Sequence, residues 1–477
     1  MKNLKILFIN PPYFRLIGQV YAYLPLGICS LAAVTKEAGY ETIVYNMDIP
    51  PIHSELFESY AQKYASYDER DVIVMNCNDD PLEVWKELES VLTTIEPDII
   101  GITALTPQVP VAKKIASLSK IHKPQATIIM GGVHASFCPE ELLREEAIDY
   151  VFSGEGEEGI LEFLTAIRNK ASLQEMGLIK GLSYKDNGTA YIAKQRPLID
   201  VNKYPMPSRE LFIFPERFQP KNMGLILTGR GCPFKCKFCS SPNLSGYTVR
   251  QRSLENILEE LEYVMKRYTI HEFMFWEDTF VANKNKVSEF CSSLKKRKLD
   301  IAWRCHTRLD TLNEDILDTM LSTSCKQINV GVETGSEKTL RYLNKSISLD
   351  RIIKKMDLIR SRTIAWSANF MIGYPEELPE DVEDTIDFIE NEVKNHIAIN
   401  TCIPYPGSQF FDDSVALGIV DNSKPIDWTF FSHRSKYACF CKYITREQLN
   451  RYMDRIKTIV APYMVKTPGA FSPCERI

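Results

Sequence analysis

The sequence predicts an α/β protein built from two parallel-sheet domains in tandem. Short apolar strands and amphipathic helices alternate in two series along the 477 residues, a pattern typical of parallel sheets covered by helices. A chain of this length exceeds what one hydrophobic core supports. We therefore expect a doubly wound, Rossmann-like domain over 1–195, a proline-bearing linker over 196–222, a second strand–helix domain over 223–415 and a small α-rich C-terminal segment over 416–477.

Composition narrows the classes of partner and compartment. Lys plus Arg number 57 and Asp plus Glu 62, for a net charge of -5, so the chain is not a general polyanion binder and nucleic acid is not an expected partner. No apolar run approaches membrane-spanning length and no leader cleavage site is visible, so we expect a cytoplasmic protein without membrane contact. Thirteen scattered cysteines argue for a reducing compartment and against a disulfide framework.

In the first domain, strands and helices alternate with clear start and stop signals. The first helix opens after Pro25 and ends at Gly39. Asp186-Asn187-Gly188, between two alternating runs, predicts a hairpin that extends the domain. The predicted strands are 4–9, 41–45, 98–103, 127–130 and 150–152, and the further helices are 85–95, 111–119 and 160–167.

Ligands of such sheets bind at the carboxyl ends of the strands, which here are 10–12, 103–106, 131–136 and 154–157. The last of these begins a literal GxGxxG, Gly154 to Gly159. Its three glutamates would crowd the helix N-terminus that should receive a pyrophosphate, and the fingerprint belongs on the first strand of its fold. We therefore do not expect NAD here.

The second domain repeats strand then helix in six units, too few for a closed eight-fold barrel. The C-terminal segment is aromatic-rich over 427–441 and helical in period over 445–463. We expect it to cover the barrel mouth, and we interpret Cys439, Cys441 and Cys474 as ordinary thiols. The predicted strands are 223–227, 272–276, 301–305, 327–332, 365–372 and 398–403, and the helices are 253–268, 284–296, 314–321, 349–361 and 381–393.

Three cysteines lie in one short loop after the first strand of this domain. Cys232, Cys236 and Cys239 are separated by three and then two residues. Iron-sulfur clusters are normally held by four thiolates and structural zinc by four N or S ligands, so three local cysteines leave one coordination position open. The alternatives are a zinc knuckle that borrows His271 or Cys305, or three unrelated core thiols.

This spacing, with the aromatic Phe238 before the last cysteine, resembles the signature of the radical S-adenosylmethionine (SAM) superfamily. The resemblance implies an open (β/α)6 partial TIM barrel with a [4Fe-4S] cluster on the three cysteines. SAM would chelate the fourth iron and be cleaved reductively to a 5'-deoxyadenosyl radical. The electron donor would be a protein such as flavodoxin or ferredoxin.

Polar residues at the ends of the later strands are candidates for SAM contacts. Carboxylates could accept hydrogen bonds from the ammonium or ribose of SAM, and an arginine could face its carboxylate. The ordinary alternative is that these residues cap the following helices or pair on the rim. With Phe238, the candidates are Glu277, Asp278, Arg304, Arg308, Glu333 and Ser336.

The strand-end loops of the first domain look like those of the cobalamin-binding domain that precedes many radical SAM barrels. No Asp-x-His-x-x-Gly follows the first strand, so a histidine is not expected to reach cobalt from that loop. His134 could substitute, although a histidine beside a glycine turn ordinarily orients its loop by hydrogen bonding. The residues that this resemblance assigns to cobalamin are Asn10, Pro12, Thr103, Thr106, Gly131, Gly132, His134, Gly154 and Glu155.

Together the two resemblances imply an enzyme similar to the class B radical SAM methyltransferases. Its expected reaction is methylation of an unactivated carbon in a small-molecule or natural-product intermediate. Cyclisation, ring rearrangement or oxidation by the same apparatus is the main alternative, and a cobalamin or iron-sulfur sensor is the non-enzyme one. A tRNA methylthiotransferase shares the cysteine loop, but Cys29, Cys77 and Cys138 do not form the N-terminal cluster motif that it would need.

Overall fold

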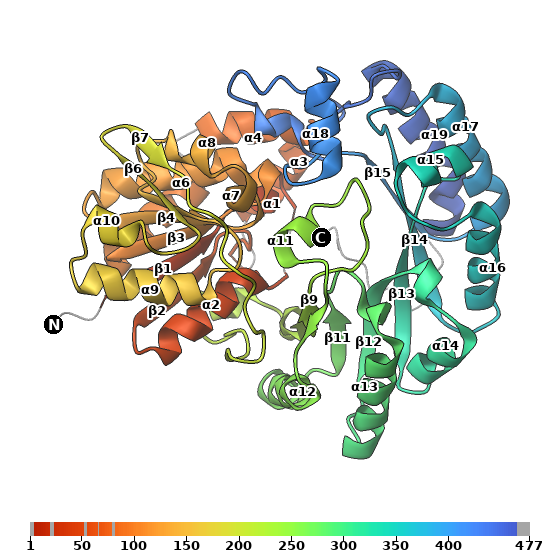
Figure 1. Cartoon of the computed structure of the whole chain (residues 1–477), viewed down its shortest axis with the longest axis horizontal. Coiled ribbons are helices and arrows are strands. Elements are labelled where there is room, and N and C mark those ends of the chain that lie inside the picture. Colours follow the sequence, from red (N-terminus) through yellow and green to blue (C-terminus); the bar gives the residue numbers. More distant parts are fainter. Residues whose placement is uncertain (1–3, 20–22, 52–54, 65, 79–81, 465–477) are drawn as a thin grey trace. The chain divides into compact units, whose positions relative to one another are not determined.

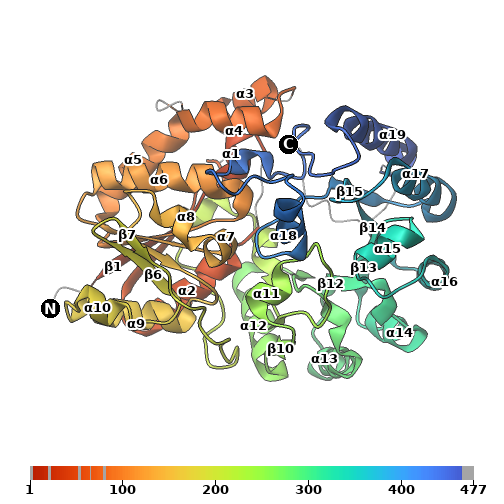
Figure 2. The same cartoon turned by 45° about the horizontal axis from the view of Figure 1, so that its top comes forward.

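The computed structural model of the protein describes residues 4–19, 23–51, 55–64, 66–78 and 82–464 (Figures 1 and 2). The chain divides into two compact units. The first comprises Met1–Met223 with Asp427–Ser432, and the second Gly224–Ile426 with the segment that starts at His433. Among the described helices, none is both long and apolar enough to cross a bilayer.

The first unit is built on a seven-stranded sheet in the order β2-β1-β3-β4-β5-β6-β7. The first five strands are parallel, β6 is antiparallel to β5, and β7 is antiparallel to β6. The order reverses at β1, which confirms the predicted doubly wound sheet with its hairpin extension. The strands are β1 (Lys5–Asn10), β2 (Glu41–Asn46), β3 (Ile99–Thr103), β4 (Thr127–Gly131), β5 (Tyr150–Phe152), β6 (Leu182–Asp186) and β7 (Thr189–Tyr191).

Helices cover both faces of this sheet, with α2 and α9 on one face and α5 and α6 on the other (Figures 1 and 2). Its central strands are therefore apolar on both faces. Gly101 of β3 shows how tightly they pack, because a Cβ there would lie 2.7 Å from Cδ1 of Phe8. The helices of the unit are α1 (Tyr13–Leu16), α2 (Leu26–Glu37), α3 (Glu55–Tyr64), α4 (Glu69–Asn78), α5 (Glu83–Ile95), α6 (Val109–His122), α7 (Val133–Phe137), α8 (Pro139–Leu143), α9 (Glu157–Arg168) and α10 (Leu173–Met176).

The segment 196–222, predicted as a linker, is instead part of the first unit. The backbone N–H of Val44 donates to Leu211 O at 2.8 Å, and Ile213 N donates to Val44 O at 3.0 Å. Arg209 is fully buried, and its Nε donates to Met223 O at 3.0 Å. β2 is the edge strand of the sheet, so its outer backbone groups have no strand partner. The segment 196–222 covers that edge and pairs with Val44.

The second unit is built on a six-stranded, wholly parallel sheet in the order β15-β14-β13-β12-β11-β8. The strands follow one another in chain order, and the end strands β8 and β15 do not pair, so the expected open partial barrel is confirmed. The strands are β8 (Leu225–Ile226), β11 (Glu272–Phe275), β12 (Ala302–Arg308), β13 (Cys325–Glu333), β14 (Ala365–Ile372) and β15 (Ile397–Thr401), with a small separate ribbon of β9 (Gly229–Arg230) and β10 (Arg250–Gln251).

Helices line the outer face of this sheet (Figure 1). On β12 the outward side chain of Trp303 packs edge-on against Phe275 and against Phe290 of α13, with ring centroids 5.5 and 6.0 Å apart. Ser253 caps α12 by accepting from Asn256 N, as predicted. The helices are α11 (Ser241–Ser245), α12 (Leu254–Tyr268), α13 (Lys284–Arg297), α14 (Glu314–Leu321), α15 (Glu337–Tyr342), α16 (Leu349–Arg360), α17 (Pro379–Phe388), α18 (Gln409–Ala416) and α19 (Arg446–Met464).

The C-terminal segment 416–477 is not one body, in contrast to the prediction. Residues Asp427–Ser432 belong to the first unit and the segment from His433 to the second. The ring of Trp428 lies 4.6 Å edge-on from that of His134, and Ser432 Oγ donates to Glu69 Oε2 at 2.8 Å. Both contacts join 427–432 to residues about 290 or more positions earlier in the chain, which no local pattern reveals.

Candidate functional site

The cysteine loop follows the first strand of the second sheet and folds back tightly on itself. The N–H of Cys232 donates to Gly246 O at 3.1 Å, and Cys239 N donates to Cys236 O at 3.1 Å. Gly231 has a φ of 96°, and a Cβ there would lie 2.5 Å from the carbonyl oxygen of Thr248. Only glycine fits at that position, so the turn that presents the thiols depends on it.

The middle of the loop is held by backbone bonds to two distant segments. Lys237 N donates to Leu343 O at 3.1 Å, and Phe410 N donates to Lys237 O at 3.1 Å. Asn344 Nδ2 donates to Lys235 O at 2.9 Å. Phe238, a predicted SAM contact, packs against a buried apolar cluster that includes Phe410. The loop is therefore a rigid part of its unit.

The three thiols share one electrostatic environment. Burial raises the pKa of Cys239 to about 12, and the charges of Cys236 and Cys232 contribute to that shift. Burial also raises the pKa of Cys236, while Arg308 and Lys345 oppose this. Deprotonation of such thiols needs a metal to compensate. Three soft sulfur donors beside two cations fit an anionic iron-sulfur cluster.

The alternative of a zinc knuckle finds no support in the placement of its proposed fourth ligands. His271 precedes β11, at the opposite end of that strand from the loop, and its Nδ1 lies 2.9 Å from Asp300 O. Cys305 lies on the outer face of β12, where its thiol interacts with Cys325. Among the residues that the structure describes, no three His, Cys, Asp or Glu side chains surround a single ion position.

Glu277 and Asp278 follow β11 beside the cysteine loop. Glu277 Oε1 accepts from Thr228 N at 2.5 Å, and Oε2 is buried without a hydrogen-bond partner in the described structure. Burial raises the pKa of Glu277 to about 7. Asp278 accepts from the hydroxyl of Ser241. A buried carboxylate oxygen that lacks a donor suits a ligand ammonium or hydroxyl group, so Glu277 stays a predicted SAM contact, whereas Asp278 has a partner in Ser241.

At the end of β13, Glu333 and Ser336 have partners within the protein. Lys345 Nζ donates to Glu333 Oε1 at 2.6 Å and to Gly331 O at 2.8 Å. Ser336 caps α15 and donates to Asp381 Oδ1 at 3.0 Å, which is the ordinary alternative foreseen for it. Lys345 escaped prediction, because nothing in the local sequence distinguishes it from the many exposed lysines.

Arg308 is predicted as a contact for the SAM carboxylate, but its guanidinium contacts other groups. Nη1 donates to Cys236 Sγ at 3.1 Å, while Nε and Nη2 donate to Asp310 at 2.9 and 2.8 Å. Nη2 also donates to Lys345 O at 2.6 Å. The guanidinium carbon lies 3.8 Å from the centroid of the Phe234 ring. Arg308 therefore binds the cysteine loop itself.

Alternation along β12 places Arg304 and His306 on the inner face of the sheet, opposite Trp303. Register brings Gln327 beside Arg304, and Asn329 beside both His306 and Ser367. Asn329 Oδ1 accepts from Gln327 Nε2 at 3.1 Å and from Ser367 Oγ at 2.6 Å. Barrel interiors are ordinarily filled by apolar side chains, so this polar inner face is unusual for a core.

Two buried atoms of the inner face have no hydrogen-bond partner in the described part of the chain. They are Nε2 of His306 and Oε1 of Gln327. Burial and the nearby Arg304 lower the pKa of His306 to about 4, so its imidazole is neutral near pH 7. Native proteins rarely leave such atoms unpaired, which suggests a bound ligand or water. Gln327, Asn329 and Ser367 were not predicted, although polar residues alternate with apolar ones at Gln327 and Asn329 on β13 and at Ser367 and Asn369 on β14.

The predicted cobalamin residues of the first unit gather at the carboxyl ends of its strands. Asn10 Nδ2 donates to Asn46 Oδ1 at 2.9 Å, which links the ends of β1 and β2. Pro12 forms the start of α1. Gly132 has a φ of 96°, and a Cβ there would lie 2.7 Å from Thr103 Oγ1. Glycine at this position lets the loops after β3 and β4 touch, with Gly131 closing β4.

His134 is fully buried, and both ring nitrogens have neighbours within hydrogen-bond reach. Nδ1 lies 3.2 Å from Thr106 Oγ1, and Nε2 lies 3.3 Å from Glu141 Oε2. Glu141 in turn pairs with Lys113. Burial lowers the pKa of His134 against the influence of Glu141. His134 therefore joins the loop after β3 to α8 by hydrogen bonding, which is the ordinary role of a histidine beside a glycine turn. Neither ring nitrogen is free to bind cobalt.

The GxGxxG loop is likewise occupied by contacts within its own unit. Gly154 N donates to Ser136 Oγ at 2.9 Å, and Glu155 Oε2 accepts from Ile199 N at 3.0 Å. Glu158 accepts from Tyr204 Oη and from Arg196 Nη1, both at 3.0 Å. Glu157 and Glu158 lie in the first turn of α9, where their negative charge disfavours a pyrophosphate.

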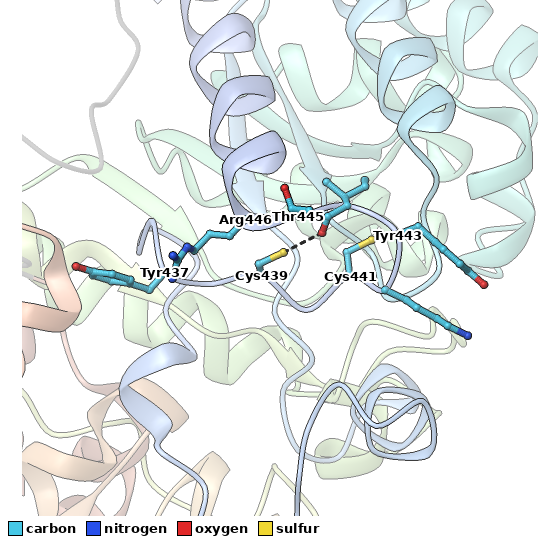
Figure 3. Close-up of a pocket in the computed structure, with 8 residues that line it drawn as sticks. Tyr437, Cys439, Cys441, Tyr443, Thr445 and Arg446 are labelled. Carbon is cyan, nitrogen blue, oxygen red and sulfur yellow. Dashed lines mark hydrogen bonds between the residues drawn. The ribbon is translucent and has the colours of Figure 1, made fainter.

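A surface hollow of about 460 Å³ lies around the C-terminal cysteines (Figure 3). Cys439 Sγ donates to Ile444 O at 3.3 Å, and Cys441 Sγ to Glu377 O at 3.2 Å. Burial raises the pKa of Cys441 to about 11. Both thiols are thus protonated donors to the backbone. Cys474 lies outside the described residues.

Comparison with known families agrees with the division of the chain into two units. Residues 226–389 match the model of the Radical SAM superfamily, and residues 20–164 match that of the B12 binding domain. The chain joins a B12-binding domain to a radical SAM domain. It is therefore an enzyme of the radical SAM kind, whose cofactors are a [4Fe-4S] cluster, SAM and cobalamin.

The chain is similar to other proteins over most of its length. An uncharacterized methyltransferase of Pyrococcus horikoshii is 29% identical over 461 residues, which cover 95% of this chain and 92% of the relative. The anaerobic magnesium-protoporphyrin IX monomethyl ester cyclase of Rubrivivax gelatinosus is 23% identical over 420 residues, which cover 86% of this chain and 70% of the cyclase. The cobalamin-dependent SAM radical enzyme OxsB, with aqua-cobalamin and SAM bound, aligns with a TM-score of 0.71 at 16% identity. That alignment spans 95% of this chain and 66% of OxsB, and it shows the fold.

Proposed function

We propose that this cobalamin-dependent radical SAM enzyme transfers a methyl group to an unactivated carbon of a polar small molecule. The observation that carries the proposal is the presence in one chain of the three-cysteine loop and a B12-binding domain. The similarity to the Pyrococcus methyltransferase over nearly the whole of both chains supports methyl transfer over other outcomes.

In this proposal the cluster and SAM supply a carbon-centred radical, and cobalamin supplies the methyl group. The protein holds and orients these groups. Cys232, Cys236 and Cys239 bind the cluster, and the free oxygen of Glu277 binds the ammonium or ribose of SAM. Cobalamin would lie at the strand ends of the first sheet, without a histidine ligand from His134. An external reductant, such as flavodoxin or ferredoxin, provides the electron.

The inner face of the second sheet supports a polar substrate. Its amide, hydroxyl and imidazole groups offer hydrogen bonds, and Arg304 adds a positive charge. A hydrocarbon placed there would leave the buried atoms of His306 and Gln327 unpaired, at a cost of roughly 1–3 kcal/mol each. A hydrogen-bonding substrate removes that cost. Substrates with hydroxyl, amide, carboxylate or phosphate groups are therefore favoured over lipids.

A labelled-methyl experiment tests the proposal. The anaerobically purified, iron-loaded protein is incubated with cobalamin, a strong reductant, CD3-labelled SAM and separate aqueous and lipid extracts of small molecules. We expect a product with one labelled methyl group in the aqueous extract, with S-adenosylhomocysteine and 5'-deoxyadenosine formed in equal amounts. Labelled product from the lipid extract alone would contradict the polar substrate.

Two alanine variants form the matched comparison. C239A should lose iron and SAM cleavage together, whereas C291A removes a buried thiol of α13 and should retain both. If C239A still cleaved SAM, the assignment of the cluster to this loop would be wrong. A wild-type protein that binds the cofactors without forming any deoxyadenosine would be a sensor.

The second candidate is a radical reaction without net methyl transfer, such as cyclisation or oxidation. It is favoured by the similarity to the Rubrivivax cyclase, which extends over 86% of this chain. The same experiment separates the two candidates. Deoxyadenosine formed without S-adenosylhomocysteine and without labelled product would identify this second reaction.

A further inference from the structure

We propose that Arg308 is a positioning residue that raises the reduction potential of the cluster by hydrogen bonding to the Cys236 thiolate. The inference rests on the proposed function, because it requires a [4Fe-4S] cluster on the loop. It begins from one contact, the 3.1 Å donation from Arg308 Nη1 to Cys236 Sγ. The side chain ends β12, is only 7% exposed, and reaches the loop from a different strand.

The guanidinium is fixed in place by its other bonds. Asp310 accepts from Nε at 2.9 Å and from Nη2 at 2.8 Å, a paired arrangement that specifies direction as well as distance. Lys345 O accepts from Nη2 at 2.6 Å, and the ring of Phe234 lies against the guanidinium plane. Only Nη1 is left to face the thiol. This arrangement holds a charged donor against one sulfur atom.

The donor is specific to one of the three cysteines. Cys232 Sγ has the hydroxyl of Thr279 at 3.8 Å, and the charged side chain that influences Cys239 is the carboxylate of Asp278. Cys236 is influenced by two cations, Arg308 and Lys345. The positive charge beside the cluster is therefore concentrated on the side of Cys236.

A donor and a positive charge at a ligand sulfur change the redox balance of a cluster in a known direction. One-electron reduction adds negative charge, so both stabilise the reduced form more than the oxidised one and raise the potential. Asp310 partly offsets the charge of Arg308, so the hydrogen bond is the larger contribution here. A raised potential makes the cluster easier to reduce by the external donor.

The test is a potentiometric titration of the full-length, iron-loaded protein without SAM, followed by EPR of the reduced cluster. R308Q should hold its iron but show a more negative midpoint, with at least tenfold less reduced cluster at a fixed potential, or 59 mV for one electron. The double variant R308Q/D310N removes the bond without changing the net charge, and it should shift in the same direction. R341Q, on the exposed face of α15, should leave the midpoint unchanged.

If R308Q does not load iron, the R308K variant takes its place, since lysine keeps the charge but not the fixed geometry. A midpoint between those of wild type and the double variant supports the inference. Variants with full iron and a wild-type midpoint overturn it while leaving the proposed function intact. Wild-type protein that never assembles a cluster would overturn the proposed function as well.

Discussion

The two parallel sheets of this protein differ in what their faces contact. Strands β1, β3 and β4 of the first sheet are apolar on both faces, with residues such as Leu7 and Ile100 fully buried. In the second sheet, the outer residues of β12, β13 and β14 are mostly apolar, and the inner ones include the polar Arg304, His306, Gln327, Asn329, Ser367 and Asn369. Parallel strands covered by helices on both sides require the first pattern. The second pattern leaves polar side chains on one face, which we propose to be the surface that binds a ligand.

The two sheets therefore differ in the surface that each can offer to a ligand. The first sheet can offer a ligand only its strand ends, where Asn10 bonds to Asn46 and Thr103 lies against Gly132. The second sheet can offer its strand ends and also its inner face. A large cofactor that lies across strand ends suits the first arrangement, and a small substrate that needs many directed contacts suits the second.

The largest expected effect on stability comes from a polar residue in the first sheet. I100N would place an amide where neither face offers a partner, and it would also remove buried apolar surface. We expect a loss of about 3–5 kcal/mol in the free energy of unfolding, or failure to fold. Urea denaturation followed by circular dichroism measures this. A loss below about 1 kcal/mol would show that the first sheet also has a polar-tolerant face.

The converse substitution in the second sheet should affect turnover more than folding. N329L replaces the amide that joins Gln327 and Ser367 with an apolar side chain of similar size. Asn329 is only half-buried, so water can pair with the two donors that lose their acceptor, and the unfolding free energy should fall by roughly 1–2 kcal/mol. Substrate-dependent methylation should fall by at least about tenfold, which corresponds to one lost hydrogen bond to the substrate.

Deoxyadenosine formation without substrate is the control for N329L, since the cluster loop and Glu277 are unchanged. It should stay within about twofold of wild type. Equal losses of methylation and of substrate-free SAM cleavage would place Asn329 in the SAM site and not on a separate substrate surface.

A buried acid at the strand ends of the second sheet should make stability depend on pH. Burial raises the pKa of Glu377 from 4.5 to about 8. Between these values the folded state binds more protons than the unfolded chain, so stability is full below about pH 4.5 and falls as the pH rises through about 8. E377Q cannot ionise, and relative to wild type it should gain on the order of 1–2 kcal/mol from pH 5 to pH 8.5.

The first unit has a comparable buried acid, Asp48. Asp48 follows β2, and burial raises its pKa to about 7, although Arg15 N donates to its Oδ1 at 2.9 Å. D48N should show a smaller relative gain, confined to the range below about pH 7. Denaturation series at four pH values compare the two variants. Curves parallel to wild type for both would mean that neither acid is protonated in the folded state.

The smallest expected effect on stability comes from an exposed ion pair, because neither sheet buries its side chains. Lys36 and Glu210 form an exposed pair at 2.9 Å in the first unit. K36Q should change the unfolding free energy by less than about 0.5 kcal/mol, and added salt should remove even that difference. Thermal unfolding at low and high salt is sufficient to measure it.

Local pattern sufficed for the elements and for the thiol site. Apolar runs with helix signals between them predicted all five parallel strands of the first unit and all six of the second sheet. The spacing of Cys232, Cys236 and Cys239 predicted one short loop that carries all three thiols. Helices α3 and α4 and the edge-covering segment 196–222 were missed, because their structure depends on packing and not on a strong local period.

The sequence by itself determined the order of the elements, the two series of parallel strands and the placing of three cysteines in one loop, because hydrophobic period and cysteine spacing are local properties of the chain. Only the tertiary structure decided which partners the polar side chains take. Arg308 binds Cys236, Lys345 binds Glu333, and His134 joins Thr106 to Glu141. Arg308 and Cys236 are 72 positions apart in the sequence, and Lys345 and Glu333 are 12 apart. A hydrogen bond forms only where folding brings donor and acceptor within about 3 Å.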